Sequence, residues 1–222
     1  EVIEDLHFNN SLYLSLKNIK ILQISATPSN SLIDASGWSN HEVVCPKVGK
    51  GYVSFETILK EKRIYDTKNL EDRSECKKYI KKVTKKEPMY HLIRSVSAGP
   101  YGSIVYRNIS TNFRRICMLK DFSLIELNMT KTESEVQEIY DSLQEKPDKH
   151  TFILIKNMLG ASKTLDDEFI GSVHESTPSK KDYSSEVQGL PGRLCGWTKK
   201  RGKDGVKIFC DRFIIERYVE LY

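Results

Sequence analysis

The stretch HTFILIKNMLGASKTL, residues 150–165, contains a strand and a loop that decide the fold of this chain. Its first part, 150–155, is a short apolar run, which is typical of a buried β-strand. A loop of small residues follows, in which Gly160, Ala161 and Ser162 allow backbone amides to approach a ligand closely. In open α/β sheets, ligands bind at the carboxyl ends of such strands.

Similar apolar runs alternate with amphipathic helices along the rest of the chain. The other strand-like runs cover 19–25, 41–45, 90–94, 123–127, 169–174 and 206–210. A helix is predicted at 133–143, because apolar residues share one face at i, i+3, i+4 and i+7: Val136, Ile139, Tyr140 and Leu143. Thr132 and Glu135 form a capping-box pattern at its start. The alternation predicts an α/β fold with a mainly parallel sheet flanked by helices.

A change in composition after Cys45 and Pro46 divides the chain into parts. We interpret 1–46 as the C-terminal part of one α/β domain. Residues 47–87 are rich in Lys and Glu, and we expect a charged connection with exposed helices there. The alternation then restarts, so 88–222 is predicted to be a second α/β domain. Because the chain begins without Met, we expect it to be part of a longer protein.

The composition excludes several classes of protein. No run of about 18 apolar residues occurs, so no transmembrane helix is expected. Five widely spaced cysteines without a CxxC pair argue against a disulfide framework and against a zinc site. We therefore expect a soluble, intracellular protein without a membrane partner.

The net charge of +5 is concentrated in two lysine-rich clusters. The first has helical spacing, which would gather its members on one face: Lys77, Lys78, Lys81, Lys82, Lys85 and Lys86. The second consists of Lys199, Lys200, Arg201 and Lys203. Such clusters attract phosphate backbones, although a solvated surface is an equally good interpretation.

Two segments near the start of the chain carry candidate chemistry. Glu4 and Asp5 follow an apolar stub, and adjacent acids at a strand end can hold Mg²⁺ on a nucleotide and orient water. Ser25 and Thr27 end the strand-like run 19–25, where small hydroxyl residues can link a nucleotide site to a neighbouring domain. The plain alternatives are an acid pair at a helix start and an ordinary turn.

Two further segments lie in the second half. In 157–165, Lys163 and Thr164 could meet the phosphates of a nucleotide or nucleic acid, or the segment is a generic loop. In QGLPGRLCGW, residues 188–197, Gln188 precedes the pair Gly192 and Arg193. This pattern suits an arginine finger, whose guanidinium binds a γ-phosphate held by another domain. A structural arginine is the alternative.

The ordered set EDLH, SATP, GASKT and QGLPGRLCGW resembles motifs II, III, V and VI of superfamily 2 helicases with two RecA-like domains. Three segments are also similar in sequence to helicases of large DNA viruses and phages: HTFILIKNMLGASKTL, FIGSVHE and VQGLPGRLCGW. The resemblance covers most of the chain outside 47–88. It implies RecA-like folds, ATP and Mg²⁺ as cofactors, and DNA or RNA as a partner.

The resemblance also assigns roles to individual residues. It implies that Glu4 and Asp5 hold the metal and activate water, and that His7 couples this motif to the second domain. The motif III hydroxyls would be Ser25 and Thr27. The nucleotide-binding residues of motif VI would be Gln188, Gly192 and Arg193. The expected nucleic-acid contacts at the carboxyl ends of strands are Arg94, Ser95, Ala161 and Thr164.

The chain departs from the helicase pattern in four places. The acid pair is Glu–Asp rather than Asp–Glu, and Gly196 stands where motif VI has a second arginine. One extra residue separates Gln188 from Gly192, and no GxxxxGK(S/T) sequence occurs. This chain alone should therefore not hydrolyse ATP, and the remainder of its protein would supply the phosphate-binding loop. Two alternatives stay open: a translocase subunit of a restriction enzyme, and a nucleic-acid-binding module that has lost ATPase activity.

Overall fold

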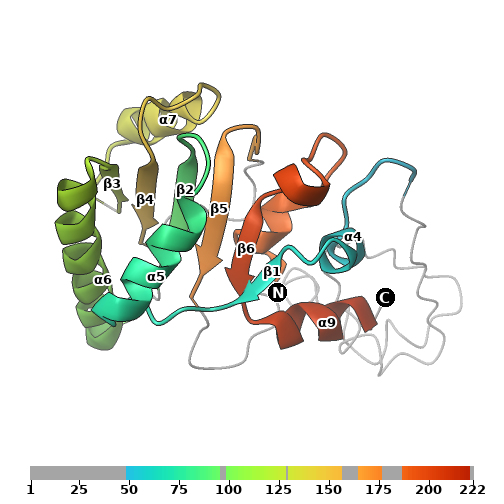
Figure 1. Ribbon diagram of the computed structural model, residues 1–222, viewed down its shortest axis with the longest axis horizontal. Coiled ribbons are helices and arrows are strands. Elements are labelled where there is room, and N and C mark those ends of the chain that lie inside the picture. Colours follow the sequence, from blue (N-terminus) through green and yellow to red (C-terminus); the bar gives the residue numbers. More distant parts are fainter. Residues whose placement is uncertain (1–48, 96–98, 129, 157–164, 177–186, 221–222) are drawn as a thin grey trace, which may run out of the picture. The chain divides into compact units, whose positions relative to one another are not determined.

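The computed structural model describes residues 49–95, 99–128, 130–156, 165–176 and 187–220 (Figure 1). The chain divides into two compact units, Glu1–Pro46 and Lys47–Tyr222. The first unit lies outside the described residues, together with the strands predicted at 19–25 and 41–45. The fold given below is that of the second unit.

The described residues form a six-stranded sheet in which all pairs of neighbouring strands are parallel. The strand order is β1-β6-β5-β2-β4-β3. The strands are β1 (Ile64–Asp66), β2 (Tyr90–Arg94), β3 (Ser123–Leu127), β4 (Thr151–Ile155), β5 (Ile170–Glu175) and β6 (Lys207–Cys210). The prediction of a mainly parallel sheet is confirmed, and the bounds of β2 to β6 agree with the apolar runs to within one residue.

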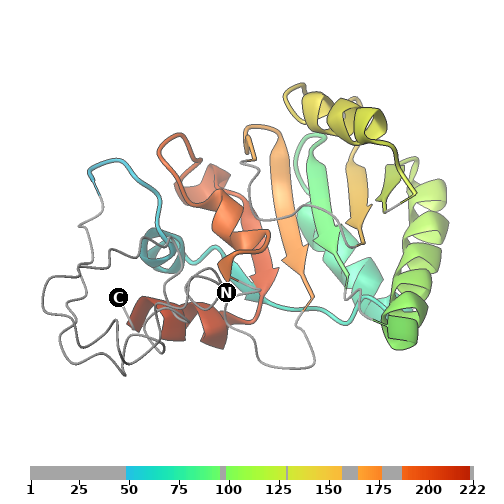
Figure 2. The ribbon, with the colours of Figure 1, turned by 180° about the vertical axis from the view of Figure 1, so that it is seen from behind.

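Helices cover both faces of the sheet. The helices are α4 (Phe55–Lys60), α5 (Arg73–Val83), α6 (Gly99–Lys120), α7 (Glu133–Ser142) and α9 (Arg212–Glu220). α5 and α6 share one hydrophobic core with the sheet, and α4, α7 and α9 pack on the other face. Accordingly, α5 lies in front of the sheet in Figure 1 and behind it in Figure 2.

The apolar run of β4 is continuous because both of its faces are buried. Phe152 and Leu154 point into the core beneath α5 and α6, whereas Ile153 and Ile155 point into the opposite core. Every residue of β4 is buried. Such continuous apolar runs are typical of central strands in parallel sheets.

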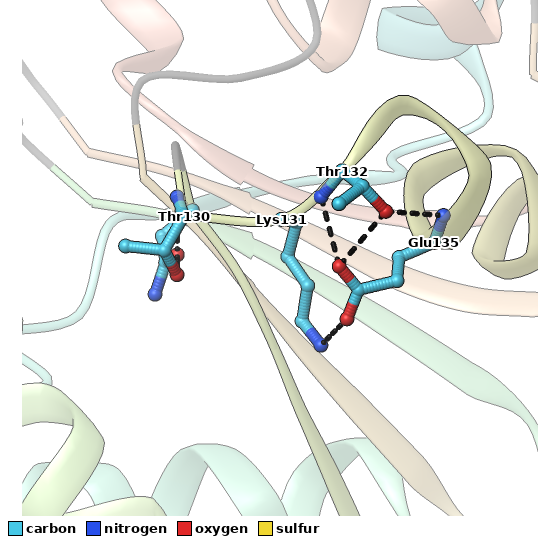
Figure 3. A network of polar contacts seen from close by, with 5 residues as sticks. Thr130, Lys131, Thr132 and Glu135 are labelled. Atoms are coloured by element: carbon cyan, nitrogen blue, oxygen red, sulfur yellow. Dashed lines mark hydrogen bonds and ion pairs between the residues drawn. The ribbon is translucent and has the colours of Figure 1, made fainter.

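The predicted helix 133–143 is confirmed as α7, and its capping box is present (Figure 3). Thr132 Oγ1 accepts a hydrogen bond from the backbone N–H of Glu135 at 3.3 Å. In return, Glu135 Oε2 accepts one from the backbone N–H of Thr132 at 2.8 Å, and Lys131 Nζ lies 2.6 Å from Glu135 Oε1. Lys131 and the two Thr132 donors lower the pKa of Glu135 to about 2.

The segment 47–87 is not the charged connection that we expected. β1 extends the sheet by pairing with β6, and α5 buries one face against the core: Cys76, Tyr79, Ile80 and Val83. These residues have the i, i+3, i+4, i+7 spacing of an amphipathic helix. The many lysines of α5 hide this apolar stripe when composition alone is considered. Among the described residues, no helix is long and apolar enough to cross a membrane.

Candidate functional site

The next described elements after β2 and β5 lie on opposite faces of the sheet. α6 follows β2, whereas the next described element after β5 is the short 3-10 helix η1 (Pro191–Leu194), which packs on the face of α4, α7 and α9. β2 and β5 are neighbours in the sheet. Ligands of open α/β sheets bind where adjacent connections diverge in this way. The carboxyl ends of β2 and β5 are therefore the candidate site.

An ion pair joins the last residues of these two strands. Arg94 Nε donates to Glu175 Oε1 at 2.8 Å, and Arg94 Nη2 donates to Glu175 Oε2 at 2.7 Å. The two residues are register partners in the parallel pair of strands. Two parallel charge-assisted hydrogen bonds fix the orientation of both side chains. The predicted contact residue Arg94 thus lies at the sheet edge, bound to a carboxylate that sequence analysis did not single out.

Glu175 also holds the segment that resembles motif VI. The backbone N–H of Leu190 donates to Glu175 Oε2 at 3.0 Å. The guanidinium of Arg193 interacts electrostatically with Glu175, with Arg94 and with Tyr140 of α7. Burial raises the pKa of Glu175, and the contacts with Arg94, Leu190 and Arg193 oppose this rise. Arg94 thus binds this buried carboxylate directly, and the charge of Arg193 acts on it electrostatically.

Arg193 is itself buried, with an exposed fraction of 7%. Burial lowers the pKa of its guanidinium, while Tyr140 and Glu175 act in the opposite direction. Gln188, its predicted partner in nucleotide binding, is exposed. The structure therefore places these two residues in different environments.

Gly192 is required by the local backbone. A Cβ atom at this position would lie 1.9 Å from the carbonyl oxygen of Val187. The resemblance implied that Gly192 binds nucleotide, and the structure shows that this glycine permits a close approach of the chain to itself. The backbone N–H of Arg193 then donates to the carbonyl of Leu190 at 3.3 Å, which continues the tight turn.

Gly196 stands where motif VI has its second arginine, and its backbone is engaged elsewhere. Its N–H donates to the carbonyl of Val53 at 3.0 Å, and its carbonyl accepts from Val53 N–H at 2.8 Å. Gly196 has φ +151°, a conformation that residues with side chains rarely adopt. The position thus joins the end of this segment to the chain before α4.

Ser95, a predicted nucleic-acid contact, directly follows Arg94 and is buried. Its backbone N–H donates to the carbonyl of Ile155 at 3.1 Å, and its hydroxyl has no hydrogen-bond partner among the described residues. The other predicted site residues lie outside the described residues: Glu4, Asp5, His7, Ser25, Thr27, Ala161 and Thr164.

The described part of the site carries two arginines and one carboxylate. Its charged groups at the sheet edge are Arg94, Arg193 and the buried Glu175, so cations outnumber carboxylates. Among the described residues, no group of three or more His, Cys, Asp or Glu residues could hold a metal ion. The predicted Mg²⁺ ligands, Glu4 and Asp5, are in the part that is not described.

The four described cysteines are free thiols, and three of them are buried. No disulfide joins Cys76, Cys117, Cys195 and Cys210. Burial raises the pKa of Cys76, Cys117 and Cys195 to about 12, so these thiols stay protonated at neutral pH. A thiol that is not ionised is a poor nucleophile, which removes these three from the candidate chemistry.

Among known proteins, this chain is similar to a protein of a giant virus. It matches no protein-family model. It is similar to the uncharacterized protein L594 of Acanthamoeba polyphaga mimivirus, with 25% identity over 170 residues. The match covers 74% of this chain and 41% of the viral protein. The chain thus spans less than half the length of this relative, whose name states no activity.

Proposed function

We propose that this chain contributes the second domain of an ATP-driven nucleic-acid motor, of the helicase or translocase type. The observation that carries the proposal is the Arg94–Glu175 ion pair at the switch point of the sheet, with the buried Arg193 near enough for its charge to act on Glu175. An all-parallel sheet with helices on both faces is the architecture expected of a RecA-like domain. The sequence QGLPGRLCGW, which contains Arg193, supports the same assignment.

In this proposal Arg193 is the arginine finger and Glu175 is a positioning residue. Glu175 holds the turn before Arg193 through the Leu190 amide and offsets the guanidinium charge within the domain. Arg94 already satisfies both carboxylate oxygens, so Glu175 keeps a partner when Arg193 turns toward a phosphate. ATP supplies the phosphoryl group whose developing negative charge the guanidinium stabilises. A phosphate-binding loop elsewhere in the protein would hold that nucleotide.

The test is ATP turnover in a protein that contains this chain together with the phosphate-binding loop. Arg193→Ala should lower turnover by about 10³ or more while nucleotide affinity changes little, because a finger acts mainly on the transition state. Arg193→Lys should rescue poorly, since it lacks the planar fork for two oxygens. Thermal melting of each variant separates lost catalysis from lost folding. A stable Arg193→Ala variant with near-normal turnover would exclude the finger.

A second candidate is a nucleic-acid-binding module without ATPase activity. The 7% exposure of Arg193 favours it, because a purely structural arginine would have the same burial. In that case Arg193→Ala should lower the melting temperature, and nucleotide should not change the affinity for a nucleic-acid strand. Nucleotide-dependent strand binding by the wild-type protein would favour the motor instead.

A further inference from the structure

The six lysines whose spacing predicted a shared helical face fall into two sets, because α5 ends at Val83, before Lys85 and Lys86. The outer set consists of Lys77, Lys78 and Lys81, which are exposed on the helix. Lys78 Nζ in this set lies 2.8 Å from Glu75 Oε1, so its charge has a partner on the same helix. The inner set consists of Lys82, Lys85 and Lys86, which lie at the end of α5 and directly after it.

A lysine from a distant part of the chain joins the inner set. Lys207, the first residue of β6, has its Nζ 3.4 Å from the backbone carbonyl of Lys82. Lys82 Nζ in turn lies 3.7 Å from the centroid of the Tyr65 ring. Lys85 and Lys86 lead from α5 toward the start of β2. The inner lysines therefore gather near the amino ends of β2 and β6, on the face that α5 covers.

The positive charges of this cluster repel one another. Partial burial lowers the pKa of Lys82, and the charges of Lys68 and Lys85 lower it further. Partial burial also lowers the pKa of Lys207, with additional effects of Lys86, Lys82 and Lys85. An anion placed among these side chains would relieve the repulsion.

The acids that face the cluster are too few and too exposed to neutralise it. Asp66 acts on Lys82, and Asp204 lies 3.3 Å from Lys86 Nζ. The side chains of Lys86 and Asp204 are 65% and 84% exposed, so water and salt screen this pair strongly. A third acid, Glu87, acts on Lys86 but pairs with Lys146 at 2.6 Å. Four lysines thus face three exposed acids in the described part of the chain, and one of these acids already has another partner.

We propose that Lys82, Lys85, Lys86 and Lys207 bind the phosphate backbone of a nucleic-acid strand, at the sheet edge opposite to Arg94 and Glu175. The inference deepens the proposed function and rests on it, because it assigns the motor a second surface for its strand. Ammonium groups are suited to phosphates as point charges. Lys82 covers the Tyr65 ring, so this aromatic face is closed to base stacking. The surface therefore holds phosphates without selecting a base sequence.

The outer lysines of α5 provide a matched control for the test. Two triple variants remove the same formal charge from the same segment. The inner triple variant is Lys82→Gln/Lys85→Gln/Lys86→Gln, and the outer triple variant is Lys77→Gln/Lys78→Gln/Lys81→Gln. Binding of labelled oligo-dT to the 222-residue chain is measured without nucleotide across a series of salt concentrations. Each lost contact with a single strand should reduce the slope of log K against log salt by about 0.7.

We expect the inner triple variant to reduce this slope by about 2 and the outer triple variant by much less. Lys207→Gln alone should reduce the slope by about 0.7. If the loss of the Lys82–Tyr65 contact unfolds the inner variant, Lys85→Gln/Lys86→Gln is compared with Lys77→Gln/Lys81→Gln. Thermal melting verifies that each variant is folded.

Equal slopes for the inner and outer variants would overturn the proposal. So would binding of poly-glutamate as tight as that of oligo-dT, since the surface would then accept an acidic polypeptide. A wild-type chain that binds no oligonucleotide also refutes it. Because the assay contains no ATP, these outcomes are independent of the Arg193 turnover test, which decides the motor itself.

Discussion

The two ends of the sheet carry positive charge in opposite ways. At the carboxyl ends, Arg94 forms an ion pair with Glu175, a carboxylate with an exposed fraction of 5%, and the charge of Arg193 also acts on this carboxylate. At the amino ends, the acids that face Lys207 and its neighbouring lysines are exposed to solvent. A buried cation needs a counter-charge within the protein, whereas a hydrated lysine can remain without one. The first end thus holds its charges in one fixed geometry, whereas the second leaves its positive charges to the solvent.

The largest expected effect of this contrast follows from Arg94→Met. Removal of the arginine leaves Glu175 buried without its bidentate partner, which should cost about 3–5 kcal/mol of stability at neutral pH. Adding Glu175→Gln should recover much of this loss, because the uncompensated charge is then gone. Urea unfolding of the single and double variants measures both effects. A loss below about 1 kcal/mol in the single variant would show that the pair behaves as an exposed one.

Lowering the pH should change the contributions of His174 and Glu175, two neighbours on β5, to stability in opposite directions. Burial lowers the pKa of His174 from 6.5 to about 4, so the folded protein keeps it neutral while the unfolded chain binds the proton. Stability should therefore fall as the pH decreases from 6.5 to 4, by about 3 kcal/mol for this residue. Burial raises the pKa of Glu175 above 4.5, and its contribution has the opposite sign, since stability is lost as the pH rises through the folded value.

Unfolding in urea at a series of pH values tests both signs. His174→Gln should flatten the loss of stability between pH 6.5 and 4, and Glu175→Gln should steepen it. A His174→Gln variant that keeps the full wild-type loss would contradict the assignment to this histidine. His91 provides a second histidine of the same kind, because burial and His150 hold its pKa well below the usual value.

A smaller effect is expected from Gly192→Ala at the carboxyl end. The new Cβ would meet the Val187 carbonyl, and the backbone shift should cost about 1–3 kcal/mol. Gly202→Ala is the control, because φ is +60° there but no atom lies within 4 Å of the new Cβ. It should lose only the strain of the left-handed conformation, about 1 kcal/mol. Equal losses in thermal unfolding would mean that the turn before Arg193 can relax.

The smallest loss of stability is expected for a substitution at the amino ends of the strands. Lys82→Met removes the cation above Tyr65, which should cost no more than about 1 kcal/mol. It also relieves repulsion with Lys85 and Lys207, which offsets part of the loss. Comparison with Arg94→Met in the same denaturant series measures the contrast between the two ends. If both substitutions destabilise the protein equally, the distinction between a paired, buried charge at one end of the sheet and solvated charges at the other end is wrong.

The sequence by itself determined the elements that depend on local periodicity. The bounds of β2 to β6 follow from apolar runs, and α7 follows from its stripe and from the Thr132–Glu135 capping box. These signals lie within a few residues of one another, so the hydrogen bonds and buried faces that they imply are local.

Only the tertiary structure decided where the charged residues meet. β1 has three residues, and it becomes a strand because β6 supplies its hydrogen bonds. Glu175 ends an apolar run, but its partner Arg94 is 81 residues away, and the register of β2 and β5 brings them together. Lys207 and Lys82 likewise meet only after β6 is placed beside β1, below α5. Periodicity tells which face of an element is buried, whereas the pairing of strands decides which distant side chains share an edge.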